Sequence, residues 1–262
     1  MAGYCLVCPA SRGIGFSLAR HLLQHTKLPV VATARKNLAE TRERLNRGID
    51  SERLSVVQVD MKDESSISAL ATHLRKRFPE EHLRLAFTLP GILHVEKSPS
   101  QIDSAAALET FTVNTLGPLL LLKHLTPLLP TKGAEPFAPH TIQKGVVALS
   151  SPHAVYSMMA ARVGSISDNR LGGWYSYRAS KAAVFQLAKT LDLYLKTRSG
   201  DRAMAVALHP GTVRTDFTRE YWGGREMLDA DEAARRLVEV VDRLGVGDGG
   251  KCWDWRGEEV LP

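Results

Sequence analysis

Short apolar segments alternate with amphipathic segments along almost the whole chain. The apolar segments are nearly continuous in hydrophobic residues, which is typical of parallel strands that are covered on both faces of a sheet. We predict strands at Gly3–Cys8, Pro29–Ala34, Leu54–Asp60, Leu83–Phe87, Gly145–Ser150, Ala203–Leu208 and Lys251–Trp255.

The segments between these strands place apolar residues at helical spacing. In the first of them, Ile14, Leu18 and Leu22 share one face. We predict helices at Gly13–His25, Asn37–Arg47, Ser65–Phe78, Ser104–Leu129, Trp174–Arg198 and Asp231–Leu244. Strict alternation of strands and helices implies right-handed crossovers. The sequence therefore predicts an α/β fold with a doubly wound parallel sheet, three αβα layers and a single domain over residues 1–262.

Length and composition agree with this fold and exclude other classes. A chain of 262 residues can bury a core that needs no metal or disulfide, so we expect no metal site. The longest apolar candidate for a membrane span, Leu116 to Leu129, contains Lys123, His124 and two prolines. The N-terminus lacks the pattern of a signal peptide. We expect a cytoplasmic protein without membrane contact.

Charge and cysteine content add two weak signals. The net charge of +6 comes from 34 basic and 28 acidic residues that are scattered along the chain. A nucleic-acid binder is a minor alternative, because a solvated surface with one phosphate site explains the charge more simply. Cys5 and Cys8 lie in a predicted strand, about 10 Å apart, too far for a disulfide. We expect buried thiols in a reducing compartment.

The first strand runs into a turn with two glycines, Cys8-Pro-Ala-Ser-Arg-Gly-Ile-Gly15, and then into a helix. Backbone N–H groups and the positive end of the helix meet in such a turn, which suits a pyrophosphate. Gly13 and Gly15 allow close approach of the backbone to a ligand and of the helix to the strand. A plain strand-to-helix turn is the alternative.

A second signal lies at the start of the helix predicted from Trp174. Tyr177 and Lys181 are four residues apart, so they project from one face of the helix. An ammonium about 4 Å from a phenol favours the phenolate by up to roughly 4 kcal/mol at an effective dielectric of about 20. Such a tyrosine can pass a proton to or from a substrate oxygen. The alternative is a half-buried tyrosine beside a solvated lysine.

Together these motifs resemble the classical short-chain dehydrogenase/reductase family over almost the whole chain, which implies a Rossmann fold. That family has Thr-Gly-x-x-x-Gly-x-Gly at the turn and Tyr-x-x-x-Lys later. Ala10–Gly15 matches fully, whereas Cys8 and Pro9 replace the Thr and the first Gly. Proline fixes φ and removes an N–H, so we expect a reshaped turn. The run Arg162–Lys181 resembles the C-factor-like branch of the family.

The resemblance also implies a dinucleotide cofactor. An acidic residue after the second strand would bind the ribose of NAD(H). Arg35 stands there instead, with Arg12 nearby, which favours NADP(H) over NAD(H). Of the family's Asn-Asn-Ala-Gly, present here as Thr88-Leu-Pro-Gly91, only Gly91 is retained. The implied cofactor contacts are Ser11, Arg12, Gly13, Ile14, Gly15, Arg35, Asp60, Met61, Gly91, Asn114, Tyr177, Lys181, Pro210, Gly211, Val213 and Thr215.

The implied catalytic residues are Asn114, Ser165, Tyr177 and Lys181. The family's serine lies at the end of the fifth strand, about a dozen residues before the tyrosine. Ser165 lies twelve residues before Tyr177 and is our first choice, with Ser151 second. On this interpretation Pro152–Ala161 is an insertion between the strand and the serine.

The resemblance finally implies a reaction. NADPH gives a hydride to a carbonyl carbon, Tyr177 protonates the oxygen, Lys181 lowers the pKa of the phenol, and a Lys181–water–Asn114 path replenishes the proton. We expect an apolar ketone or aldehyde, because Phe217–Met227 takes the place of the family's substrate lid and the inserted Met158 and Met159 could line the pocket. The alternative is a catalytically weak or inactive member that acts as a dinucleotide-binding sensor or scaffold.

The family also suggests an oligomer. Homodimers or homotetramers are usual in it, and they pack through the helices that carry Asn114 and Tyr177. We expect a small-molecule carbonyl or alcohol as the other partner.

Overall fold

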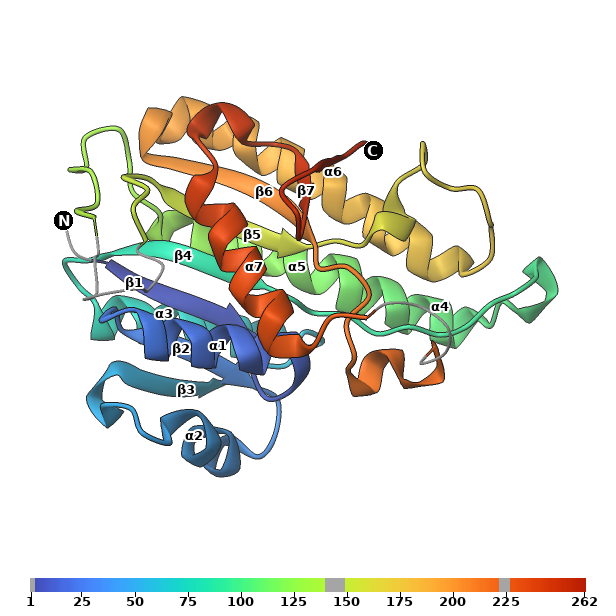
Figure 1. Ribbon diagram of the computed structural model, residues 1–262, viewed down its shortest axis with the longest axis horizontal. Helices are drawn as coiled ribbons and strands as arrows, with labels where there is room; N and C mark the ends of the chain where they lie inside the picture. Colours follow the sequence, from blue (N-terminus) through green and yellow to red (C-terminus); the bar gives the residue numbers. More distant parts are fainter. Residues whose placement is uncertain (1–2, 140–148, 222–226) are drawn as a thin grey trace.

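The computed structural model describes residues 3–139, 149–221 and 227–262. Its centre is an eight-stranded sheet in the order β3-β2-β1-β4-β5-β6-β7-β8 (Figure 1). All neighbouring strands are parallel except β7 and β8. The strands are β1 (Gly3–Cys8), β2 (Val30–Ala34), β3 (Leu54–Gln58), β4 (His82–Thr88), β5 (Ala154–Met159), β6 (Ala203–His209), β7 (Cys252–Asp254) and β8 (Glu259–Val260).

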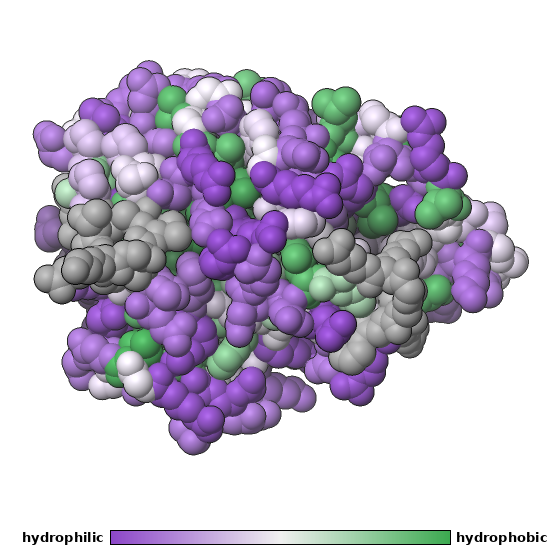
Figure 2. Space-filling view, viewed as in Figure 1, coloured by the Kyte–Doolittle hydropathy of each residue, from purple (hydrophilic) through white to green (hydrophobic). Residues whose placement is uncertain are grey.

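Helices cover both faces of this sheet. One core cluster joins the sheet to α3, α5 and α6, and the other joins it to α1, α2 and α7. The longer helices are α1 (Gly13–His25), α2 (Leu38–Asn46), α3 (Glu64–Arg77), α4 (Ser104–Phe111), α5 (Gly117–Leu125), α6 (Tyr175–Arg198) and α7 (Ala230–Arg243). The outer surface on the α1 and α7 side is mostly hydrophilic, with small apolar areas (Figure 2). The predicted three-layer, doubly wound fold is confirmed.

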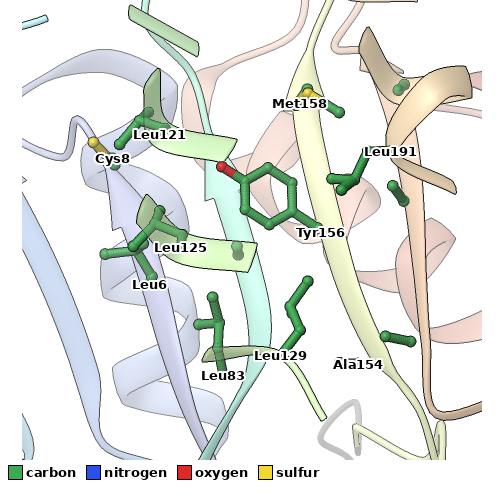
Figure 3. Packing of buried hydrophobic residues seen from close by; sticks show 14 of the residues in the cluster. Leu6, Cys8, Leu83, Leu121, Leu125, Leu129, Ala154, Tyr156, Met158 and Leu191 are labelled. Carbon is green, nitrogen blue, oxygen red and sulfur yellow. The ribbon is translucent and has the colours of Figure 1, made fainter. Parts of the chain in front are cut away.

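Leucines from several elements meet on the α5 and α6 side of the sheet. Leu121, Leu125 and Leu129 lie over Leu6 and Leu83, with Tyr156 of β5 beside them (Figure 3). These side chains are fully buried. At roughly 1.5–3 kcal/mol for each buried leucine, this layer fixes α5 on the sheet.

The fifth strand differs from the prediction. β5 pairs in parallel with β4 and with β6 through Val155, which lies opposite Leu85 and Met204. Of the predicted strand Gly145–Ser150, residues 145–148 lie outside the described residues, and Ser150 instead donates to the Asp242 carboxylate. The predicted segment has four consecutive apolar residues, 146–149, whereas Ser157 lies in the middle of β5.

That serine is accommodated within the sheet. The Ser157 hydroxyl donates to the carbonyl of Ala86 in β4 at 2.5 Å, so its polarity is satisfied in the interior. Pro152–Ala161 is therefore not an insertion but contains the strand itself. Met158 consequently lies in the core rather than in the pocket.

The long helix predicted at Ser104–Leu129 is interrupted. A π-helical turn at Thr112–Leu116 separates α4 from α5, and a short 3₁₀ turn follows at Thr126–Leu128. By length and composition alone, Ser104–Leu128 is apolar enough to cross a membrane. Core helices of soluble proteins meet the same criterion, and Leu121 and Leu125 pack against the sheet. We therefore assign this helix to the fold.

Candidate active site

A cleft of about 1180 Å³ lies where the parallel strands end. Because β1 lies between β2 and β4, successive crossovers leave it in opposite directions, and such a reversal opens a crevice at the carboxyl ends of the strands. The predicted contacts Ser11, Arg12, Gly13, Ile14, Gly15, Arg35, Asp60, Met61, Gly91, Tyr177, Lys181, Pro210, Gly211, Val213 and Thr215 all line it. Asn114 and Ser165 are not among the described residues that do so.

The turn after β1 forms one end of the cleft. Helix α1 begins at Gly13, which has φ of +54°, and its first turn contains no acidic residue. A Cβ on Gly15 would lie 2.0 Å from the carbonyl oxygen of Pro9, so no larger residue fits without a backbone shift. The Cys8–Pro9 peptide bond is cis. The close approach of Gly15 to Pro9 places the N-terminus of α1 against the end of β1, which suits a phosphate group.

Basic side chains border the cleft next to this turn. Arg12, Arg35 and Lys36 are exposed and line the cleft, and within the described ranges none of the three has an ion-pair partner. Lys36 was not among the predicted contacts, although it follows Arg35 directly. These cations are free to meet an anionic group.

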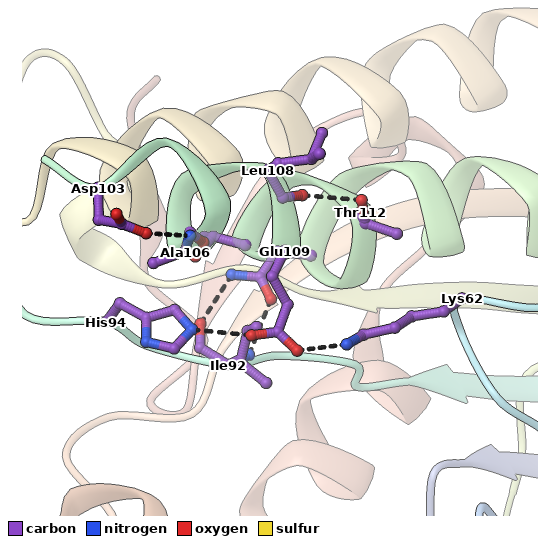
Figure 4. Close-up of polar contacts among 10 residues, drawn as sticks. Lys62, Ile92, His94, Asp103, Ala106, Leu108, Glu109 and Thr112 are labelled. Atoms are coloured by element: carbon purple, nitrogen blue, oxygen red, sulfur yellow. Dashed lines mark hydrogen bonds and ion pairs between the residues drawn. The ribbon is translucent and has the colours of Figure 1, made fainter.

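A charged cluster spans another part of the wall. Glu109 of α4 accepts from Lys62 after β3, and His94 Nε2 lies 3.2 Å from Glu109 Oε2 (Figure 4). Hydrogen bonds from Lys62 first and His94 second lower the pKa of Glu109. Lys62 and Glu109 line the cleft beside the predicted Asp60 and Met61. Sequence spacing could not reveal this cluster, because its members come from three separate elements.

Tyr177 and Lys181 lie together near the start of α6, as their spacing predicts. Lys181 Nζ lies 5.9 Å from the centroid of the Tyr177 ring, and it donates to the carbonyls of Met159 at 2.9 Å and Pro90 at 3.3 Å. Both side chains are buried. Burial lowers the pKa of Lys181 to about 8 and raises the pKa of Tyr177 above its ordinary value.

The expected acidification of the phenol is thus wrong for this arrangement. Burial disfavours each charged form, and the Lys181 ammonium is directed at two backbone carbonyls rather than at the phenol oxygen. At neutral pH, Tyr177 is therefore a neutral proton donor, which suits the direction of carbonyl reduction.

The lowered pKa of Lys181 should make the stability of the protein depend on pH. Its pKa of about 8 lies below its unfolded value, so between pH 8 and 10.5 the unfolded chain binds more protons and stability rises with pH. We expect the melting temperature of the wild type, minus that of Lys181→Met, to increase from pH 7 to pH 9.5, measured by calorimetry. A difference that stays flat or falls would contradict a depressed lysine pKa.

Asn114 lies in the π-helical turn, which lets its side chain point inward. Its Nδ2 donates to the Ile92 carbonyl at 2.9 Å and to Ser180 Oγ at 3.0 Å, and its Oδ1 accepts from the Ile92 N–H at 2.8 Å. A Cβ on Gly91 would lie 3.4 Å from Lys181 Nζ and 4.0 Å from Asn114 Oδ1. Asn114 and Lys181 therefore both approach Gly91 from the side on which its Cβ would lie, although Asn114 itself is buried and is not among the described residues that line the cleft.

The serine prediction does not fit the structure. Ser165 is buried, and its Oγ accepts from the Asp168 N–H at 3.0 Å. Ser151 precedes β5 and lies at the opposite end of that strand from the cleft. The residues that leave β5 along the cleft are Met159, Ala160 and Ala161, none of which has a hydroxyl. Ser165 was chosen for its twelve-residue distance from Tyr177, and that distance does not place its side chain at the strand end.

Aromatic side chains surround the Tyr177 ring. The rings of Trp174 and Phe217 each lie 6.2 Å from it, centroid to centroid. Of the predicted lid Phe217–Met227, residues 222–226 lie outside the described residues, whereas Met159 lines the cleft as expected. His209 also lines the cleft, although it was not among the predicted contacts. Burial lowers its pKa to about 4, and its Nδ1 accepts from the Arg162 N–H at 3.3 Å.

The glycine-bearing turn, which suits a phosphate, and the buried Tyr–Lys pair of α6 line the same cleft at the carboxyl ends of the parallel strands. Together they define a dinucleotide-dependent oxidoreductase. Residues 9–248 match the family described as "Enoyl-(Acyl carrier protein) reductase". The chain belongs to the classical short-chain dehydrogenase/reductase family.

Its relatives are oxidoreductases and related proteins. It is 28% identical over 246 residues to the 1-hydroxy-2-glutathionyl-2-methyl-3-butene dehydrogenase of Rhodococcus sp., with 94% of this chain and 93% of that protein covered. It is 31% identical over 160 residues to the C-signal of Myxococcus xanthus, with 61% of this chain and 80% of that protein covered.

Solved structures agree with this assignment. The carbonyl reductase Sniffer of D. melanogaster superposes with a TM-score of 0.83 at 26% identity, with all of both chains covered. An NADPH-bound carbonyl reductase from chicken fatty liver superposes with a TM-score of 0.82 at 29% identity, covering 100% of this chain and 99% of that one. The chain is therefore an oxidoreductase of the type that transfers a hydride between a nicotinamide and a carbonyl or alcohol carbon.

Proposed function

We propose that this protein is a cytoplasmic, NADP(H)-dependent reductase of apolar ketones or aldehydes. The observation that carries the proposal is a single cleft that joins the glycine turn, the free cations Arg12 and Arg35, and Tyr177. The buried, unpaired thiols of Cys5, Cys8 and Cys252 agree with a reducing compartment.

The residues present fit the dinucleotide. The turn from Ser11 to Gly15 and the N-terminus of α1 would hold the pyrophosphate, and Arg12 and Arg35 would hold a 2′-phosphate. Bound NADPH would supply the hydride. Pro210–Thr215, after β6, would border the nicotinamide end, where a Cβ on Gly211 would lie 2.6 Å from Trp255 Nε1.

Tyr177 would donate its proton to the substrate oxygen. Lys181, held by the carbonyls of Met159 and Pro90, keeps a proton donor beside that phenol. Asn114 holds the segment next to Gly91 in place by accepting from the Ile92 N–H. A positioned general acid of this kind contributes about 10²–10⁴-fold to the rate.

The walls near Tyr177 favour an apolar substrate. Trp174, Phe217, Met159 and Val163 line the cleft around the phenol. The direct test is the oxidation of NADPH, followed by absorbance, with aryl ketones and aldehydes compared against polar carbonyl compounds of similar size. Turnover of the polar set alone would contradict an apolar substrate.

Arg35 should decide the choice of cofactor. Its replacement by alanine removes a charge-assisted contact to the 2′-phosphate worth about 1.5–3 kcal/mol. We expect Arg35→Ala to raise the Kd for NADPH about 10- to 100-fold and to leave the Kd for NADH nearly unchanged, measured by calorimetric titration.

Arg42 provides the matched control for this experiment. It is also an exposed arginine, lies nearby on α2, and is absent from the cleft lining. Arg42→Ala should bind both cofactors like the wild type. Equal losses of NADPH and NADH affinity in Arg35→Ala would count against the proposed phosphate contact.

We also propose self-association through α4 and α5. Leu108, Leu116 and Leu119 are 70%, 46% and 46% exposed along this helical segment, an unusual number of large apolar side chains for a free surface. We expect sedimentation velocity to show a dimer or tetramer, and Leu116→Glu with Leu119→Glu to yield monomers. A monomeric wild type at all concentrations would contradict this proposal.

One observation favours the second candidate, a dinucleotide-binding sensor or scaffold with weak catalysis. The chain leaves β5 along the cleft without a side-chain hydroxyl, so Tyr177 lacks the partner that the family's serine provides. Tight NADPH binding without turnover of any carbonyl substrate would support this candidate.

A further inference from the structure

The loop that follows β4 contacts three parts of the site. Its Pro90 carbonyl accepts from Lys181 Nζ, and Ile92 exchanges two hydrogen bonds with Asn114. Farther along, Glu96 contacts the N-terminus of α6, which carries Tyr177. One short segment, Pro90–Glu96, therefore touches the lysine, the asparagine and the helix start that bears the tyrosine.

Glu96 is a carboxylate in an unusual place. Glu96 is only 3% exposed, and it is not among the described residues that line the cleft. Its Oε2 accepts from the Ser176 N–H at 2.7 Å, and its Oε1 accepts from the Ser176 hydroxyl at 2.6 Å. Both donors belong to Ser176, which lies 80 residues later in the chain and directly before Tyr177.

The start of α6 needs such a partner. The residue that precedes the helix, Trp174, has φ of +52° and gives no side-chain cap, and Gly172 and Gly173 also have positive φ. A non-glycine residue in this conformation is held only by its surroundings. The Trp174 N–H donates to the Glu96 carbonyl at 2.6 Å, and the carboxylate satisfies a free N–H of the first helical turn.

A second clamp acts from the other side. The Arg178 guanidinium donates to the carbonyls of Gly172, Gly173 and Val163 at 3.0–3.1 Å. This clamp fixes the loop before α6 to the helix itself, however, and not to the segment that holds Lys181 and Asn114. Glu96 joins the residues at the start of α6 to that segment.

We propose that Glu96 is a positioning residue, which sets Tyr177 and Trp174 in register with Lys181 and Asn114. The inference rests on the proposed function, because it assigns Glu96 to the proton transfer by Tyr177. Lys181 is anchored to Pro90, and Tyr177 is anchored through Ser176 to Glu96 on the same loop. Without the Glu96 carboxylate, the hydrogen bonds from Ser176 that hold Tyr177 are lost, whereas the hydrogen bond from Lys181 to the Pro90 carbonyl remains.

The test compares Glu96→Ala with Glu96→Gln in the full chain. A misplacement of about 1 Å lowers rates about 100-fold, so we expect Glu96→Ala to lower kcat by about that factor while the Kd for NADPH stays within about twofold. Glutamine has an oxygen that can accept from the Ser176 N–H and an amide that can donate to the hydroxyl. Glu96→Gln should therefore keep kcat within about tenfold of the wild type.

Two further variants complete the experiment. Ser176→Ala removes one of the two hydrogen bonds to the carboxylate and should lower kcat about tenfold, which covers the case in which Glu96→Ala does not fold. Glu64→Gln is the control, since Glu64 pairs with Lys123 and His124 away from the cleft and its loss should leave kcat unchanged.

Three results would overturn the proposal. They are a kcat for Glu96→Ala within threefold of the wild type, a Glu96→Gln as impaired as Glu96→Ala, or a loss of NADPH binding that parallels the loss of kcat. A Tyr177→Phe variant measured alongside separates this outcome from failure of the proposed function. If Tyr177→Phe is inactive while Glu96→Ala is fully active, only the role of Glu96 is refuted.

Discussion

Replacement of Tyr177 by phenylalanine should lower kcat/KM for carbonyl reduction about a thousandfold and leave NADPH binding intact. The phenol lines the cleft, where it would meet the substrate oxygen, and general acids contribute about 10²–10⁴-fold. Because burial keeps the pKa of Tyr177 above its ordinary value, the group donates rather than accepts at neutral pH. Steady-state kinetics with an aryl ketone and a separate titration of NADPH check both parts.

Tyr175 gives this experiment an internal control. It lies on the same helix, is 40% exposed, and does not line the described cleft. Tyr175→Phe should have wild-type kinetics. If Tyr177→Phe retains activity, the proton comes from elsewhere, and the proposed role of the phenol is wrong.

Substitution of Gly15 by alanine should damage both the fold and the cofactor site. The added Cβ would lie 2.0 Å from the Pro9 carbonyl oxygen, and this neighbour is backbone that cannot rotate away. Such overpacking lowers the free energy of unfolding by about 1–3 kcal/mol. The shift also moves N–H groups of the turn, and loss of one contact to a charged phosphate weakens binding by about 10- to 100-fold.

Thermal unfolding with and without NADPH measures both effects, since a ligand that binds the native state raises its melting temperature. Gly133→Ala is the matched control, because a Cβ there would meet no atom within 4 Å. A Gly15→Ala variant with wild-type melting temperature and NADPH response would show that the turn does not hold the cofactor.

Most of the elements follow from local patterns. The first strand and the first helix, Gly3–Cys8 and Gly13–His25, occur at the predicted residues, because continuous and helical apolar spacing each bury a face in only one way. The Tyr177–Lys181 pair needed only its four-residue spacing on a helix. The short strand Glu259–Val260 was not predicted, since two residues carry no periodicity.

The fifth strand shows where local pattern is insufficient. Gly145–Ser150 is the predicted strand, yet Ala154–Met159 pairs with β4 and β6. Its Ser157 is satisfied by a carbonyl 71 residues away, which no local pattern reveals. Ser165 was chosen for its distance from Tyr177, and counting along the chain does not show which residues follow the strand into the cleft.

The family, the parallel sheet, the glycine turn and the tyrosine–lysine helix could be predicted from the sequence, since each depends on residues close together in the chain. The groups that surround them follow from the packing of distant segments. It directs Lys181 at two carbonyls, raises the pKa of Tyr177 by burial and brings Glu96 to the start of α6. Burial and long-range hydrogen bonds depend on how distant segments pack, and no short pattern in the sequence records that packing.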